Sequence, residues 1–184
     1  MSNIKDKSYK IKNNSSVLIR TAYPNDAEKI IAIKKSIVME NTFMLREIEE
    51  AVYTFESEKK DIENHLKNNG SLYIVAEIEN RVIGFLEFEN GGLKKTSHSG
   101  MFTIFLLKQW REMRIGNLLM NTLIEWAEKN PVIEKITLAV FSTNERAQYL
   151  YKKFGFTEEG RCPKDMKLKD GTYMDSVLMY KFVK

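Results

Sequence analysis

The chain has 184 residues, of which 43% are hydrophobic and 29% charged, and its formal net charge at pH 7 is +4. This length suits one domain with a substantial core, and the composition is that of an ordinary soluble globular protein. No apolar run approaches the roughly 20 residues of a membrane span, and the polar start MSNIKDKSYKIKNN lacks the apolar core of a signal peptide. We therefore expect a cytoplasmic protein. The single cysteine, Cys162, excludes an internal disulfide and a cysteine-based metal cluster.

The pattern of elements predicts one mixed α/β domain over residues 16–184, preceded by a polar, flexible tail over residues 1–15. Hydrophobic spacing, caps and glycine or proline breaks predict strands over 17–23, 72–77, 82–89, 101–107, 133–141, 156–160 and 173–182. The same signals predict helices over 27–39, 54–69, 115–129 and 145–153. The fold class is therefore a mostly antiparallel mixed sheet of six to seven strands, flanked by about four helices.

The segment 104–119, IFLLKQWREMRIGNLL, places an apolar strand directly before a basic turn and the start of a helix. A helix N-terminus presents unpaired backbone N–H groups and the positive end of the helix dipole, which together attract phosphate. Lys108, Arg111 and Arg114 add positive charge to this turn. It lacks the glycines of a Walker loop or a dinucleotide fingerprint, so the pattern alone indicates only an anion site.

Three segments resemble the GNAT superfamily of acetyl-CoA-dependent N-acetyltransferases: LLKQWREMRIGNLLM, NERAQYLYKKFGFTEEGR and DGTYMDSVLMYKF, in this order. The resemblance covers about residues 17–182. It implies a GNAT-type fold whose sheet splays at the fourth predicted strand, with acetyl-CoA as co-substrate and no metal ion. It also implies an acyltransferase that acetylates a primary amine by direct attack in a ternary complex. The amine would belong to a small molecule, an amino acid or a protein N-terminus.

The family motif Arg/Gln-x-x-Gly-x-Gly/Ala holds the CoA pyrophosphate with backbone N–H groups. The match here begins at Arg111 and ends at Gly116, and Arg114 stands where the first glycine is expected. By resemblance the cofactor-binding residues are Leu106, Leu107, Arg111, Glu112, Met113, Arg114, Ile115, Gly116, Asn117, Asn144 and Tyr151. Glycine permits close approach and unusual φ values, so Arg114 either supplies a substitute contact to phosphate or weakens the site.

The resemblance also implies the catalytic groups on the donor side. Tyr151 would be the general acid that protonates the departing CoA thiolate, and the backbone amide of Leu106 would be the oxyanion donor. Asn144 lies seven residues before Tyr151, about two helical turns, so the two side chains share one helix face. Two structural alternatives remain: Asn144 only caps the helix, and Tyr151 is a core aromatic.

A base is needed on the acceptor side, because an ammonium group has no lone pair for attack. Candidates are Glu87 and Glu89 near the end of the third predicted strand and His98 before the fourth. Strand alternation predicts that both glutamates share a face with Ile83 and Phe85. We select Glu87 as the base, with a water relay or proton loss to solvent as alternatives.

Acceptor specificity in this family lies in two segments, which correspond here to residues 40–53 and 162–172. The first contains four acidic residues that could attract a cationic amine, or that simply form a solvated acidic helix face: Glu40, Glu47, Glu49 and Glu50. The second segment contains charges of both signs and indicates no particular substrate.

Two departures from the family pattern keep a second function open. Arg114 replaces a motif glycine, and Met101 stands where related enzymes carry a glutamate that can take a proton. The alternative is a GNAT-like domain that binds acyl-CoA with weak or no catalysis. A nucleic-acid-binding domain has little support, because no predicted helix carries a basic stripe. We expect acetyl-CoA and an amine as partners, with no nucleic acid and no membrane, while edge strands such as 173–182 leave a homodimer open.

Overall fold

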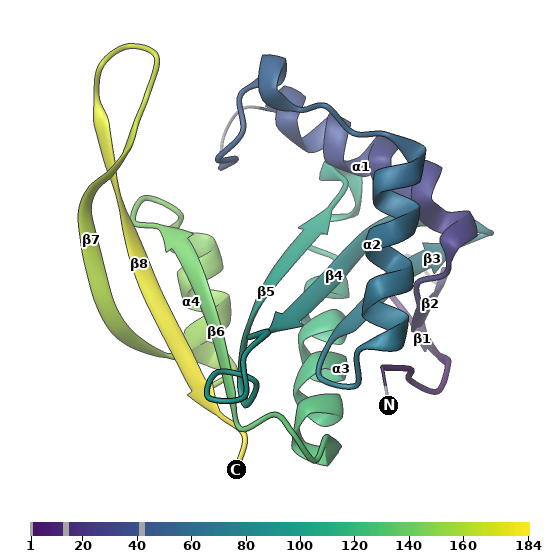
Figure 1. Cartoon of the computed structure of the whole chain (residues 1–184). Helices are drawn as coiled ribbons and strands as arrows, with labels where there is room; N and C mark the ends of the chain where they lie inside the picture. The colour runs from purple at the N-terminus through teal and green to yellow at the C-terminus, as the bar shows by residue number, and fades with distance from the viewer. Residues whose placement is uncertain (1, 13–14, 41–42) are drawn as a thin grey trace.

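The computed structural model describes residues 2–12, 15–40 and 43–184. In this part of the chain, eight strands form one sheet in the order β1-β2-β3-β4-β5-β6-β8-β7 (Figure 1). The strands are β1 (Lys7–Lys10), β2 (Ser16–Thr21), β3 (Leu72–Ile78), β4 (Arg81–Asn90), β5 (Ser99–Leu106), β6 (Lys135–Phe141), β7 (Thr157–Lys167) and β8 (Tyr173–Phe182). Only the β5–β6 pair is parallel. The predicted mostly antiparallel mixed sheet is confirmed, with one strand more than expected.

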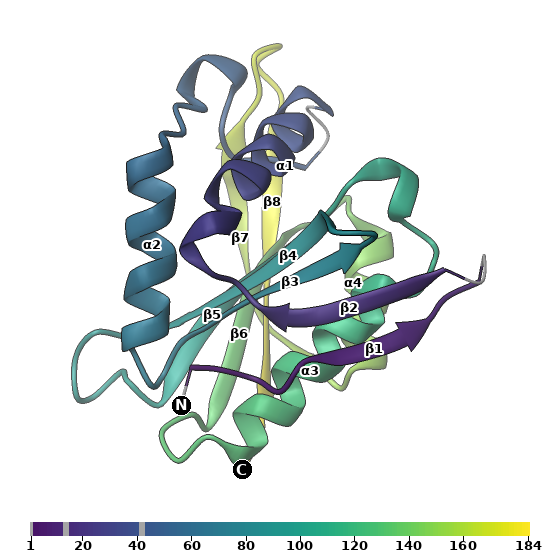
Figure 2. The same ribbon diagram turned by 90° about the vertical axis from the view of Figure 1, so that its right-hand side faces the viewer.

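Four helices flank the sheet: α1 (Ala27–Glu40), α2 (Phe55–Lys67), α3 (Ile115–Lys129) and α4 (Glu145–Lys153). Figure 2 shows α2 and α3 on opposite sides of the sheet, and each side has its own apolar core. The predicted capping of α2 is confirmed, because the Thr54 side chain accepts the Ser57 N–H at 3.2 Å. None of the helices within the described residues is long and apolar enough to cross a bilayer.

The prediction of a flexible tail over residues 1–15 is wrong for residues 2–12, which the structure describes. Strand β1 pairs antiparallel with β2, with Lys7 opposite Ile19. Ile11 is buried after β1, and the hydroxyl of Ser2 donates to the Leu66 carbonyl at 2.6 Å. Tyr9 is the residue of β1 that packs against the core, so this short edge strand carries no alternating apolar signal in the sequence.

The sheet opens between β5 and β6. These strands pair only from Ser99↔Lys135 to Met101↔Thr137, whereas β5 continues along β4 to Leu106. Beyond Met101 the two strands therefore diverge into a V, which is visible in Figure 1. The predicted splay at the fourth predicted strand, which is β5, is confirmed.

A β-bulge in β4 corrects one expectation about the face of Glu87. Ala76 pairs with Gly84 and Glu77 with Val82, so Ile83 is an extra residue in β4. Ile83 packs in the core on the α3 side, whereas Phe85 packs in the core on the α1 and α2 side. Glu87 therefore shares its face with Phe85 and not with Ile83.

The start of α1 is fixed by a buried arginine on β2. Arg20 forms a bidentate pair with Asp26 at 2.7 and 2.8 Å, and its guanidinium also donates to Glu77 of β3 at 2.6 Å. The side chains of Arg20, Asp26 and Glu77 are 14%, 5% and 13% exposed. This cluster joins two strands to the helix that carries Lys34 and Glu40 toward the open end of the sheet.

Candidate functional site

A cavity of about 1270 Å³ occupies the opening between β5 and β6. Its walls include the inner residues of both strands, the turn before α3 and the first turn of α4. On the other side of the sheet it reaches α1, α2 and residues 43–46 of the connecting loop. The cavity thus runs through the sheet from the predicted anion-binding turn to the polar face of α2.

The turn before α3 carries a run of free backbone donors. Among the described residues, none accepts a hydrogen bond from the N–H groups of residues 112–116. Glu112 and Arg114 have positive φ angles of 68° and 65°, in the left-handed region. Successive amides in such alternating conformations form a concave site for anions, and the N-terminus of α3 adds its dipole. This geometry suits a bound anion.

Arg114 is held in a conformation that suits glycine. It is the N-cap of α3 with φ 65° and ψ 10°, and its side chain is exposed. An L-residue other than glycine pays about 1–2 kcal/mol for this region. The turn therefore adopts a left-handed conformation that favours glycine despite the arginine, and the exposed Arg114 side chain adds a positive charge to it.

We expect Arg114→Gly to raise the free energy of unfolding slightly, by about 0.5–1 kcal/mol, because relief of left-handed strain exceeds the extra entropy of an unfolded glycine. Urea denaturation measures this change. Glu112→Gly is the matched control, since Glu112 has the same φ sign but the opposite charge. Both variants should gain stability, whereas only Arg114→Gly should weaken the binding of a phosphate ligand. Loss of stability in Arg114→Gly would show that its side chain holds the turn.

Arg111 does not extend its side chain into this turn. Its two terminal nitrogens pair with Glu40 at 2.7 and 2.9 Å, and its Nε donates to the Leu106 carbonyl at 3.0 Å. The side chain thus ties the end of β5 to the end of α1 across the cavity. The resemblance made Arg111 a cofactor-binding residue, but its guanidinium is engaged with Glu40. The side chain of Arg114 is exposed and lines the same cavity.

Leu106 and Leu107, which the resemblance implies in acetyl-CoA binding, differ in their backbone hydrogen bonds. The Leu107 N–H donates to the Ile83 carbonyl at 3.0 Å, and the Leu107 carbonyl accepts from Trp110. Both backbone groups of Leu107 therefore have partners within the protein. Because strand N–H groups alternate in direction, the N–H of Leu106 points away from β4, toward the gap left by β6. Leu106 is thus the residue whose amide faces the cavity.

Tyr151 and Asn144 both line the cavity from α4. The Tyr151 ring packs edge-on against Phe102, with centroids 5.6 Å apart, and burial raises the pKa of its hydroxyl to about 12. That hydroxyl bonds to none of the residues described by the structure, so it is a free donor in the wall. The Asn144 side chain accepts the Ala147 N–H at 3.1 Å, so the predicted capping role is confirmed.

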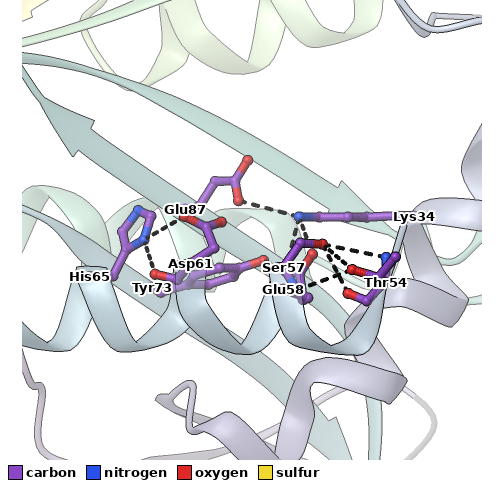
Figure 3. Close-up of polar contacts among 8 residues, drawn as sticks. All are labelled: Lys34, Thr54, Ser57, Glu58, Asp61, His65, Tyr73 and Glu87. Atoms are coloured by element: carbon purple, nitrogen blue, oxygen red, sulfur yellow. Dashed lines mark hydrogen bonds and ion pairs between the residues drawn. The ribbon is translucent and has the colours of Figure 1, made fainter. Parts of the chain in front are cut away.

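Glu87 lies on the acceptor side within a cluster of charged groups (Figure 3). Its carboxylate is 3.8 Å from the Lys34 ammonium, which also binds both oxygens of Glu58 at 2.9 and 2.8 Å. Figure 3 shows the Asp61 carboxylate on the other side of Glu87, next to His65. Burial raises the pKa of Glu87, and the charge of Asp61 raises it further against the opposing effect of Lys34. A carboxylate with a raised pKa suits a general base.

The other expected acceptor-side groups lie elsewhere. Glu89 and His98 are exposed and line a second, smaller cavity. Three of the four acids in the segment 40–53 form ion pairs within the protein: Glu40 binds Arg111, and Glu47 and Glu49 bind Lys169 at 3.2 and 3.1 Å.

The sequence analysis missed four members of the Glu87 cluster: Lys34, Glu58, Asp61 and His65. Glu58, Asp61 and His65 are spaced three and four residues apart, so they share one face of α2. That spacing was the signal in the sequence that could have identified this cluster. A polar helix face that lines a cleft has the same pattern as one that faces water, and the sequence does not distinguish them.

Comparisons with known proteins agree with this geometry. Residues 41–156 match the Acetyltransferase (GNAT) family. The chain is 32% identical over 110 residues, 60% of its length, to the L-amino acid N-acetyltransferase AaaT of Escherichia coli (strain K12), of which the match covers 67%. The structure of a GNAT-family acetyltransferase from Streptococcus pneumoniae superposes with a TM-score of 0.86 and 25% identity, covering 90% of this chain and 99% of that one.

A third relative has a bound co-substrate. The GNAT superfamily phosphinothricin acetyltransferase from Sinorhizobium meliloti, in complex with acetyl-CoA, superposes with a TM-score of 0.77 and 18% identity, and the match covers 95% of this chain and 89% of that one. At this identity the likeness concerns the fold alone. The family match extends over more than half of the chain, so this protein belongs to the GNAT family of acetyltransferases and is an N-acetyltransferase.

Proposed function

We propose that this protein transfers the acetyl group of acetyl-CoA to a primary amine of a small molecule, an amino acid or a protein N-terminus. One observation carries the proposal: a single cavity contains free phosphate-binding amides, the Leu106 N–H, the Tyr151 hydroxyl and the carboxylate of Glu87. These groups serve the two halves of an acetyl transfer. The name of the Escherichia coli relative supports an amino acid as the acceptor.

The donor half of the cavity fits a phosphorylated thioester. The free amides of residues 112–116 and the Arg114 guanidinium would hold the pyrophosphate. The gap between β5 and β6 leaves strand backbone unpaired, so the pantetheine arm can bind there as an added strand. The Leu106 amide would face the thioester carbonyl, where a donor of this kind lowers the barrier by about 3–4 kcal/mol. Acetyl-CoA supplies the acetyl group when bound.

The acceptor half fits a cation. Glu58, Asp61 and Glu87 bring three carboxylates to one wall of the cavity, whereas Lys34 is the cation that pairs with two of them. An ammonium group entering here gains attraction and then meets Glu87, which accepts its proton. The resulting amine attacks the thioester carbon directly. Cys162 lies on β7 outside the described lining of this cavity, so an acyl-cysteine route has no support.

Tyr151 completes the reaction on the leaving-group side. With a pKa of about 12 its hydroxyl stays protonated throughout the physiological range, so it is available as a donor to the departing thiolate. We expect Tyr151→Phe to lower kcat by about 10–100-fold, because the donor is lost while the ring and its packing remain. Tyr149→Phe is the matched control, since Tyr149 lies on the same helix and is 73% exposed.

The test is an acetylation assay on free amino acids, small amines and peptides with free N-termini. Release of the CoA thiol gives the rate, and mass spectrometry identifies the N-acetyl product. The proposal requires turnover with at least one amine class and a slower Tyr151→Phe variant. Binding of acetyl-CoA with no product from any amine would instead support the alternative, a GNAT-like domain that binds acyl-CoA without efficient catalysis.

A further inference from the structure

A second cavity of about 650 Å³ lies beside the first, on the same side of the sheet as α2. The two cavities share four lining residues: Asp61, Glu87, Met101 and Thr103. His65 lines the second cavity and not the first. Glu87 therefore faces two compartments, and the proposed function uses only one of them.

The His65 ring is held in one tautomer. Its Nδ1 lies 2.9 Å from the Asp61 carbonyl oxygen, which can only accept, so Nδ1 carries a hydrogen in both charge states. The Asp61 carboxylate lies 3.4 Å from the same nitrogen. Protonation must therefore occur at Nε2. This atom is buried and has no partner among the described residues, although the His65 side chain is only 6% exposed. A buried polar atom without a partner calls for a functional reason.

The proposed reaction must discharge one proton in each turnover. An acceptor R–NH₃⁺ has three hydrogens on nitrogen and its acetylated product has one. One of the two lost protons ends on the CoA sulfur, and the other must reach solvent. A path through the second cavity would let Glu87 release the proton that it has taken while both substrates still occupy the first cavity.

We propose that the second cavity is this proton exit and that His65 Nε2 is the relay atom in it. Glu87 takes a proton from the ammonium group in the first cavity and passes it across the second cavity to the lone pair of Nε2. Because Nε2 is buried, this transfer requires the second cavity to open toward that atom. His65 then carries hydrogens on both nitrogens, and the Asp61 carboxylate stabilises the imidazolium until its proton leaves to solvent. His65 touches neither substrate and acts through Glu87. The inference rests on the proposed function.

The charges around His65 favour this role. Burial alone would lower the pKa of His65, but Asp61 and, more weakly, Glu87 outweigh it, so its pKa is raised. The charged or titratable groups facing this region come from every element packed around it: Lys34 of α1, Glu58 and Asp61 of α2, Tyr73 of β3, Glu87 and Glu89 of β4, Lys95 and His98 of the β4–β5 loop, and Lys135 of β6. Glu58 and Tyr73 are bonded to each other at 2.7 Å.

The first test is His65→Asn, whose amide can still donate to the Asp61 carbonyl but cannot titrate. We expect kcat at neutral pH to fall at least tenfold, within the usual range for a lost proton-transfer group, while acetyl-CoA affinity stays unchanged. His98→Asn is the matched control, because the chain has two histidines and His98 is exposed in the same cavity. In His65→Ala, added imidazole should restore the rate. Wild-type kcat in His65→Asn, or no rescue by imidazole, would overturn the proposal.

The second test does not depend on activity. NMR titration resolves the two histidines, and we expect the His65 pKa to fall in Glu87→Gln. If no amine is acetylated, the proposed function fails, and this titration still decides the coupling: a shift at His65 supports the path, and no shift overturns it. The same spectra report whether Nδ1 carries the hydrogen in neutral His65, as the path requires.

Discussion

Replacing Glu87 with glutamine is expected to lower kcat/KM by about 10²–10⁴-fold at neutral pH, the range for loss of a general base. Glutamine has nearly the same shape and leaves Lys34 paired with Glu58. The wild-type rate should rise with pH as Glu87 loses its proton, over a range above the usual pKa of a glutamate because burial raises it. This rise should be absent in Glu87→Gln. Steady-state kinetics across pH measure both effects.

Glu87→Gln should be more stable than the wild type at neutral pH, although it is less active. When the pKa of a carboxyl is higher in the folded state than in the unfolded state, the free energy of unfolding falls as pH rises from the unfolded pKa to the folded pKa. Glutamine removes this penalty, so Glu87→Gln should unfold at a higher urea concentration than wild type at neutral pH. Glu89→Gln is the matched control, because Glu89 lies on the same strand and is exposed. Equal kinetics in Glu87→Gln and Glu89→Gln would exclude Glu87 as the base.

Arg20→Met is expected to lower the free energy of unfolding by about 3–5 kcal/mol, since it removes the cation that pairs with both Asp26 and Glu77 and leaves Asp26 with the half-exposed Lys29 at 3.8 Å. The measurement is urea denaturation at neutral pH. Lys7→Met is the matched control: the Lys7–Glu125 pair is 45% and 48% exposed, and such pairs contribute roughly 0–1 kcal/mol. A similar small change in both variants would show that Arg20 does not anchor α1.

The pH dependence of this anchor follows from Asp26. Burial would raise the pKa of its carboxyl, but Arg20 and the Tyr23 N–H outweigh this and hold it below its usual value. A lowered folded-state pKa gives stability that is present above the unfolded value, near 3.9, and is lost as pH falls through the folded one. The difference between wild type and Arg20→Met should therefore shrink in acid.

The parts of the fold that the sequence predicted well have strong local signals. The bounds of α3 and β8 match the expected ranges 115–129 and 173–182, because a strand–turn–helix pattern and an alternating strand mark their ends. The anion-binding turn was also predictable, since helix N-termini and basic residues identify it. The divergence of β5 and β6 came from the family resemblance alone.

The remaining features depend on distant contacts. The ion pair between Arg111 and Glu40 joins residues 71 positions apart, so a motif alone could not show that Arg111 is engaged. The bulge at Ile83 adds one residue to β4 and has no mark in the sequence. The sequence analysis assigned no role to His65. It shares one face of α2 with Asp61, and the packing of α2 against the sheet brings both residues to Glu87.

The most direct test of the account is isothermal titration of acetyl-CoA into the wild-type protein, compared with S-acetylpantetheine, which lacks the pyrophosphate. Free amides at the start of α3 and the edge of β5 that β6 leaves unpaired beyond Met101 predict micromolar binding of acetyl-CoA and at least tenfold weaker binding of the fragment. Equal affinity for both would contradict the phosphate-binding role of residues 112–116. No binding of acetyl-CoA to the folded protein would contradict the acetyltransferase mechanism itself.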